Sequence, residues 1–107
     1  MSKDVVTMGT LTFGDYSNVD TFLEESRPQI YSKVIEIFQK MNNEKDLNIV
    51  SFKIEAQING EGWIKQMGFS KENKEDLIET ILPYFEEVED YELCNEIKIL
   101  YKELTND

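Results

Sequence analysis

Residues 47–58, LNIVSFKIEAQI, alternate between apolar and polar side chains and are followed at once by Asn59-Gly60. A period of two is that of a β-strand with one buried face, so we predict a strand here. Asparagine and glycine both tolerate the positive φ angles of a two-residue turn, and the pair therefore predicts a hairpin. The apolar face of this strand comprises Val50, Phe52, Ile54, Ala56 and Ile58.

A return strand is predicted over residues 62–69, GWIKQMGF. Either a two-residue turn or a four-residue loop puts Trp63, Met67 and Phe69 on the apolar face of the first hairpin strand. Lys65 falls on the same face and must extend its ammonium group to the edge of the sheet. We therefore predict that Trp63 is a core residue, with a ligand-stacking platform as the alternative.

The segment before the hairpin predicts one strand and one helix. Residues 5–13, VVTMGTLTF, are rich in β-branched side chains, and Gly9 either weakens this strand or marks a bulge. Apolar residues then recur at helical spacing from Val19 until Asn42. Pro28 cannot donate a backbone hydrogen bond, so the helix is expected to kink or restart there.

The most polar stretch is residues 75–96, EDLIETILPYFEEVEDYELCNE, which contains no basic side chain. Its net charge of −9 leaves only −2 for the rest of the chain, because the whole protein carries −11. The nine acids are Glu75, Asp76, Glu79, Glu86, Glu87, Glu89, Asp90, Glu92 and Glu96.

The part of this stretch from Glu75 to Asp90 is predicted to be an amphipathic helix that carries most of its acids opposite an apolar stripe. Ser70 and Asn73 are candidate caps at its start, with Asp76 completing an imperfect capping box after Asn73, and Pro83 predicts a kink. If residues 75–96 were mostly helical, they would span about 33 Å, with charges about as dense as those along one DNA strand. The expected buried residues are Leu77, Ile78, Ile81, Leu82, Phe85 and Val88.

Residues 93–104 fit two templates. Ile97, Ile99 and Tyr101 alternate as in a strand, whereas helical spacing accounts for six apolar positions and leaves out only Ile99. The helix is therefore preferred. We predict an α+β fold with the order β-α-β-β-α-α and a three-stranded antiparallel sheet covered by helices. A ferredoxin-like order, β-α-β-β-α-β, is the alternative if the last segment is a strand.

The composition is poor in catalytic groups. The chain has no histidine, and Cys94 is its only cysteine, so we expect no catalytic residue, cofactor or metal site. A mechanism that uses carboxylates alone stays open. The lone cysteine suits the reducing cytoplasm, and the absence of a long apolar run predicts that the protein has no membrane anchor. We expect a single domain that is monomeric or homodimeric.

The net charge of −11 disfavours direct binding to nucleic acid and favours a basic protein partner, in particular a nucleic-acid-processing enzyme. The alternative is that the acids serve only solubility. The predicted partner-binding residues are acidic side chains with two neighbouring tyrosines. They are Glu75, Asp76, Glu79, Glu86, Glu87, Glu89, Asp90, Glu92, Tyr84 and Tyr91.

In its small size, acidity and lack of catalytic groups, the chain resembles anti-CRISPR proteins that occupy the nucleic-acid channels of Cas nucleases. It is similar in the same respects to immunity proteins that block nuclease toxins. Either resemblance implies a non-enzymatic inhibitor that acts as a nucleic-acid mimic. The rival hypothesis is a structural or regulatory subunit that dimerises through the sheet face carrying Ile49 and Ile64.

Overall fold

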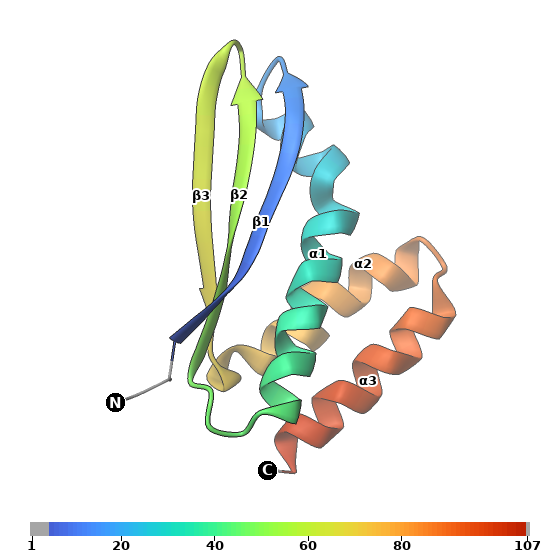
Figure 1. The fold of residues 1–107 in the computed structure, drawn as a ribbon. Coiled ribbons are helices and arrows are strands. Elements are labelled where there is room, and N and C mark those ends of the chain that lie inside the picture. Colours follow the sequence, from blue (N-terminus) through green and yellow to red (C-terminus); the bar gives the residue numbers. More distant parts are fainter. Residues whose placement is uncertain (1–4, 107) are drawn as a thin grey trace.

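The computed structural model describes residues 5–106, and in it a three-stranded sheet packs against helices on one face (Figure 1). The strands are β1 (Val5–Tyr16), β2 (Ile49–Ile58) and β3 (Glu61–Phe69), in the spatial order β1-β2-β3. The predicted α+β class and the order β-α-β-β-α-α are confirmed. The ferredoxin-like alternative is wrong, because the last segment is a helix.

The predicted hairpin is confirmed, and it has the two-residue turn. β2 and β3 are antiparallel, Ile58 lies opposite Glu61, and Phe52 lies opposite Met67. Asn59 has a φ of 54° and Gly60 a φ of 82°, the left-handed conformations that this turn requires. The turn residues therefore set the register of the whole hairpin.

The pairing of β1 corrects one prediction. β1 runs parallel to β2, with Val6 opposite Val50, so the sheet is mixed instead of wholly antiparallel. The cause is the intervening helix, which returns the chain to the end of the sheet where β1 began and makes a parallel crossover possible. Gly9, with a φ of 82°, lies at a shift of register, which confirms the predicted bulge.

The crossover helix α1 (Val19–Asn43) runs without a break for 25 residues, and its first turn is capped by Asn18 Oδ1, which accepts from the Thr21 N–H at 2.8 Å. The restart expected at Pro28 does not occur. The helix continues because both of its halves are buried against the sheet, through Phe22 before the proline and Ile30 after it.

The core lies between α1 and the inner face of the sheet. Val50, Phe52, Ile54 and Ala56 are buried, as the alternation of β2 predicts. Trp63 and Met67 were predicted to be core residues but are only half-buried. The reason is that α1 packs over β1 and β2, which leaves part of β3 uncovered.

After β3 the chain forms a 3₁₀ turn, η1 (Lys71–Lys74), a π-helical turn, η2 (Leu77–Ile81), and the helices α2 (Leu82–Glu87) and α3 (Tyr91–Thr105). The disturbance expected at Pro83 takes the form of η2, in which the Leu82 N–H donates to the Leu77 carbonyl.

The cap at the start of this segment is Ser70, one of the two predicted candidates. Asn73 Oδ1 accepts from the Ser70 N–H at 2.8 Å, so Asn73 closes a cap that begins at Ser70. The side chain of Asp76 makes no capping hydrogen bond to η2. The predicted cap at Ser70 is therefore confirmed, whereas the capping box of Asn73 with Asp76 is wrong because the 3₁₀ turn begins before the helical stretch.

We expect Phe52→Ala to lower the free energy of unfolding by about 3–5 kcal/mol, because the ring is fully buried and its removal leaves a cavity. Urea denaturation would measure the loss. Ile64→Ala on the adjacent strand is the matched control, since Ile64 is 67% exposed on the opposite face of the sheet. Equal losses in the two variants would contradict the assigned faces.

Candidate functional site

The predicted acidic helix is interrupted by a reversal of the chain. α2 ends at Glu87 and α3 begins at Tyr91, and the two helices meet at a corner on the side of the molecule away from the sheet (Figure 1). The span of about 33 Å, which would follow if residues 75–96 were one continuous helical stretch, therefore does not apply. Most of the acids cluster at residues 86–92, EEVEDYE, which we call the acidic corner.

The backbone of the acidic corner is a Schellman motif, a common end of an α-helix. The Glu89 N–H donates to the Glu86 carbonyl at 3.1 Å, and the Asp90 N–H donates to the Phe85 carbonyl at 3.0 Å. Glu89 has a φ of 62°, the left-handed position that glycine normally occupies. Glu89, which has a β-carbon and a charged side chain, therefore occupies a backbone conformation that favours glycine.

All five acids of the corner are exposed to solvent. Two of them have a local structural role: Asp90 Oδ1 accepts from the Leu93 N–H at 3.3 Å, and Glu92 lies in the favourable first turn of α3. Glu86 and Glu87 lie instead in the last turn of α2, where the helix dipole disfavours negative charge. Helix stability does not explain these two charges or that of Glu89.

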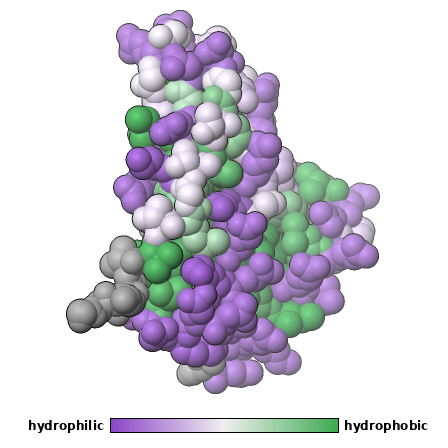
Figure 2. All heavy atoms as spheres, in the orientation of Figure 1, coloured by the Kyte–Doolittle hydropathy of each residue, from purple (hydrophilic) through white to green (hydrophobic). Residues whose placement is uncertain are grey.

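Two hydrophobic side chains stand among these acids. Val88 is 52% exposed and Tyr91 is 66% exposed. Val88 was expected on the buried stripe, but α2 ends before it, so the helical angle that predicted its burial does not apply. In Figure 2 hydrophobic residues reach the surface among hydrophilic ones over α2 and α3.

The remaining predicted partner-binding residues lie outside the corner. Asp76 is half-buried, and Glu79 is exposed one helical turn before α2. Both oxygens of Glu75 accept from the hydroxyl of Tyr101, each at 3.0 Å. This hydrogen bond, together with burial, raises the pKa of Tyr101, and it ties the start of the acidic stretch to α3.

Tyr84 packs within the molecule. Its ring centroid lies 5.4 Å from that of Tyr31, and the guanidinium carbon of Arg27 lies 5.9 Å from the ring centroid. Of the two tyrosines assigned to partner binding, only Tyr91 therefore stands on the acidic corner. The sequence offered no sign that Arg27 and Tyr84, from separate helices, would meet.

Cys94 lies behind the acidic corner and is buried on α3, as its helical position predicted. Burial raises the pKa of its thiol, and the negative charges of Glu86 and Asp90 raise it further. Because the thiolate is the reactive form, these effects suppress nucleophilic chemistry at this cysteine.

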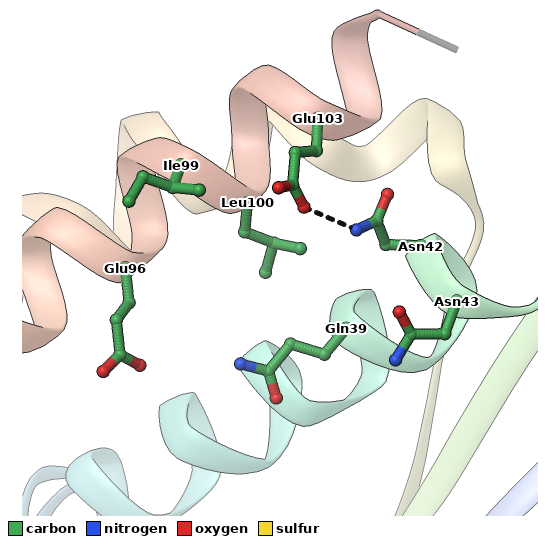
Figure 3. Close-up of a pocket in the computed structure, with 7 residues that line it drawn as sticks. All are labelled: Gln39, Asn42, Asn43, Glu96, Ile99, Leu100 and Glu103. Atoms are coloured by element: carbon green, nitrogen blue, oxygen red, sulfur yellow. Dashed lines mark hydrogen bonds between the residues drawn. The ribbon is translucent and has the colours of Figure 1, made fainter.

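A second candidate is the groove between the C-terminal half of α1 and α3 (Figure 3), with a volume of about 350 Å³. The Asn42 side-chain N–H donates to Glu103 across it at 2.8 Å. Gln39 and Glu96 extend from the two helices at its other end. These amides and carboxylates can form hydrogen bonds to a polar ligand, but the lining contains no nucleophile paired with a base.

Within residues 5–106 no group of three or more histidine, cysteine or acidic side chains is arranged to hold a metal ion. No described helix is long and apolar enough to cross a membrane.

Comparisons with known proteins add no further assignment. No family model matches the chain, and no significantly similar protein was found among curated proteins or solved structures. The candidate site therefore stands on its geometry alone.

We expect Glu89→Gly to raise the free energy of unfolding by about 0.5–1 kcal/mol, because glycine adopts the left-handed conformation without steric cost. Thermal and urea denaturation would measure the gain. Glu87→Gly is the matched control, since it makes the same chemical change within α2 and should cost about 0.5–1 kcal/mol. A loss in both variants would show that Glu89 is not strained.

The pKa of Tyr101 should lie above the ordinary tyrosine value of about 10, and the loss of one tyrosinate absorbance step in Tyr101→Phe would assign it. Because its folded-state pKa is raised, the hydrogen bond to Glu75 stabilises the fold below the ordinary tyrosine pKa of about 10. That stability is lost as pH rises through the folded-state pKa. The urea midpoint should therefore fall more steeply above pH 10 in the wild type than in Tyr101→Phe, and parallel curves would contradict this assignment.

Proposed function

We propose that this protein is a non-enzymatic inhibitor whose acidic corner binds a basic, nucleic-acid-binding surface of a partner protein. The observation that carries the proposal is the composition of the corner, in which exposed Val88 and Tyr91 are surrounded by five carboxylates. Protein interfaces commonly combine a few desolvated hydrophobic anchors with a charged rim. The carboxylates would speed encounter and set orientation, while Tyr91 and Val88 would supply buried contact area.

The local energetics support a functional role for the corner. Three of its acids oppose stability: the charges of Glu86 and Glu87 lie at the end of α2 against its dipole, and the β-carbon of Glu89 is held in a left-handed conformation. Departures from local rules are expected at functional sites, where activity compensates for lost stability. A surface that served only solubility could carry the same charges at positions without these costs.

The corner also defines how such an inhibitor would act. The chain reverses at residues 88–90, so its acids form a compact projection and not a continuous helix with the charge spacing of one DNA strand. A projection of this kind fits a local cluster of basic side chains that normally contacts phosphates. Anti-CRISPR-type inhibition of a Cas nuclease is our first choice of partner class, and inhibition of a nuclease toxin is the second.

The rival hypothesis of an apolar dimer finds less support in the fold. Ile49 and Ile64 are exposed on the open face of the sheet, by 42% and 67%. Ile64 lies opposite Glu55, six positions along β2 from Ile49, which separates the two by about 20 Å. Polar side chains such as Lys53 lie between them, so these isoleucines do not form one continuous patch.

The test is a cleavage assay with a panel of purified Cas nucleases and nuclease toxins. We expect the protein to inhibit at least one of them when it is added before the nucleic-acid substrate, and not when it is added afterwards. Inhibition should weaken as salt rises from about 50 to about 300 mM, because screening reduces attraction between the charged surfaces. Salt-independent inhibition would contradict a charge-driven mechanism.

The triple variant Glu86→Lys, Glu87→Lys and Glu89→Lys should weaken inhibition by about tenfold or more. Asp90 is left unchanged because it caps α3. The matched control reverses three exposed acids elsewhere, Glu25, Glu61 and Glu72, and changes the net charge equally. If both variants inhibit equally well, or lose inhibition equally, the acidic corner is not the binding surface.

A further inference from the structure

A second surface, of opposite character, lies between the N-terminal half of α1 and the sheet. It is a groove of about 480 Å³ whose floor is formed by β2 and β3 and whose wall is formed by α1. The lining is mostly aliphatic and aromatic, which is typical of a binding site. It comprises Val19, Leu23, Arg27, Ile30, Tyr31, Ile54, Trp63, Lys65 and Met67.

The groove is basic in a strongly acidic protein. Its two charged lining residues are Arg27 and Lys65, and no carboxylate lines it. Both side chains are exposed, and within residues 5–106 neither forms a salt bridge. The ring of Tyr84 supports the guanidinium of Arg27, whose planar N–H donors can then engage a carboxylate. The charge of the groove is therefore complementary to an anionic group.

The same surface includes an open strand edge. In the described sheet β3 pairs only with β2, so its outer backbone N–H and carbonyl groups have no strand partner. The pairing of β3 with β2 is unbroken from Glu61 to Phe69, whereas β1, at the other edge, is interrupted by shifts in register. Natural proteins protect edge strands with bulges, and β3 lacks one. An edge with regular, uninterrupted pairing can accept another strand.

We propose that this protein binds an extended peptide segment of a partner, rich in aliphatic and acidic residues, as a fourth strand along the outer edge of β3. The peptide backbone would pair with β3. Alternate side chains would enter the groove, where aliphatic groups contact Trp63 and Met67 and a carboxylate binds Arg27 and Lys65. The lined part of β3, residues 63–67, matches about five peptide residues, or about 17 Å.

This site is separate from the acidic corner and does not depend on it. The corner offers carboxylates to a basic surface, whereas the groove offers cations and apolar area to an acidic peptide. Leu23, which is 40% exposed in the groove wall, and half-buried Trp63 and Met67 would lose their remaining exposure when the peptide binds. That burial would supply contact area beyond the backbone hydrogen bonds.

The test is selection from a library of random octapeptides displayed on phage, with the full chain as bait. We expect every second residue of the selected peptides to be aliphatic or acidic, because only alternate side chains enter the groove. Trp63 is the only tryptophan, so synthetic copies of these peptides should shift its fluorescence emission on binding. A selection without this pattern, or peptides that bind without altering Trp63, would overturn the proposal.

A charge-reversed variant then tests the cations. Arg27→Glu with Lys65→Glu should weaken peptide binding by about tenfold or more. The control Lys53→Glu with Lys98→Glu makes the same change of net charge at exposed sites outside the groove and should alter affinity by less than about twofold. Equal affinities for the two variants would exclude the groove as the site.

Strand pairing is tested on the wild-type protein, so no variant has to fold. Methylation of alternate peptide nitrogens blocks one edge of the peptide strand and leaves the other edge unchanged. One of the two methylation patterns should abolish binding, and the other should preserve it. Equal tolerance of both patterns would show that the peptide does not add to β3.

Discussion

The arrangement of α1 on the sheet depends on the contacts made by the ring of Phe22. This fully buried side chain of α1 lies 5.3 Å from the ring of Phe13 and 5.1 Å from that of Tyr16, both on β1. It also lies 5.1 Å from the ring of Trp63 on β3. This one aromatic residue of α1 therefore contacts both outer strands, β1 and β3, and fixes the position of α1 above β2.

The position of α1 decides where the protein exposes apolar surface. A single helix covers β1 and β2 in this half of the sheet, while α2 packs beside the middle of α1 and α3 beside its C-terminal half, as Figure 1 shows. Part of β3 consequently lies beyond the helical layer, and the groove beside Trp63 and Met67 is the result. Both the uncovered part of β3 and the groove exist because α1 is not wide enough to cover all three strands.

The two candidate surfaces differ in charge and in how their charges are held. The carboxylates of the corner oppose one another and, in part, the dipole of α2, so their arrangement costs stability unless a basic surface neutralises them. The cations of the groove sit over apolar side chains, and Tyr84 supports one of them from α2. A chain with twice as many acidic as basic residues thus keeps a basic site by placing two cations where no acid lines the groove.

The sequence alone determined the elements whose causes are local. The alternation of β2, the turn at Asn59-Gly60 and the helical spacing of α3 each depend on residues near one another in the chain, and each was predicted. The acidic composition of residues 86–92 was also evident before the structure. Only the tertiary structure showed that β1 lies next to β2, and because the connecting helix returns the chain to the end of the sheet where β1 began, that pairing is parallel.

The reversal after Glu87 escaped prediction for a related reason: no glycine marks the left-handed position, which Glu89 occupies instead. The half-burial of Trp63, the contact of Arg27 with Tyr84 and the groove beside β3 also depend on packing between segments distant in sequence. Side-chain pattern shows which face of an element is apolar. It does not show whether another element covers that face. In this protein the covered apolar faces form the core, and an uncovered apolar face forms the groove.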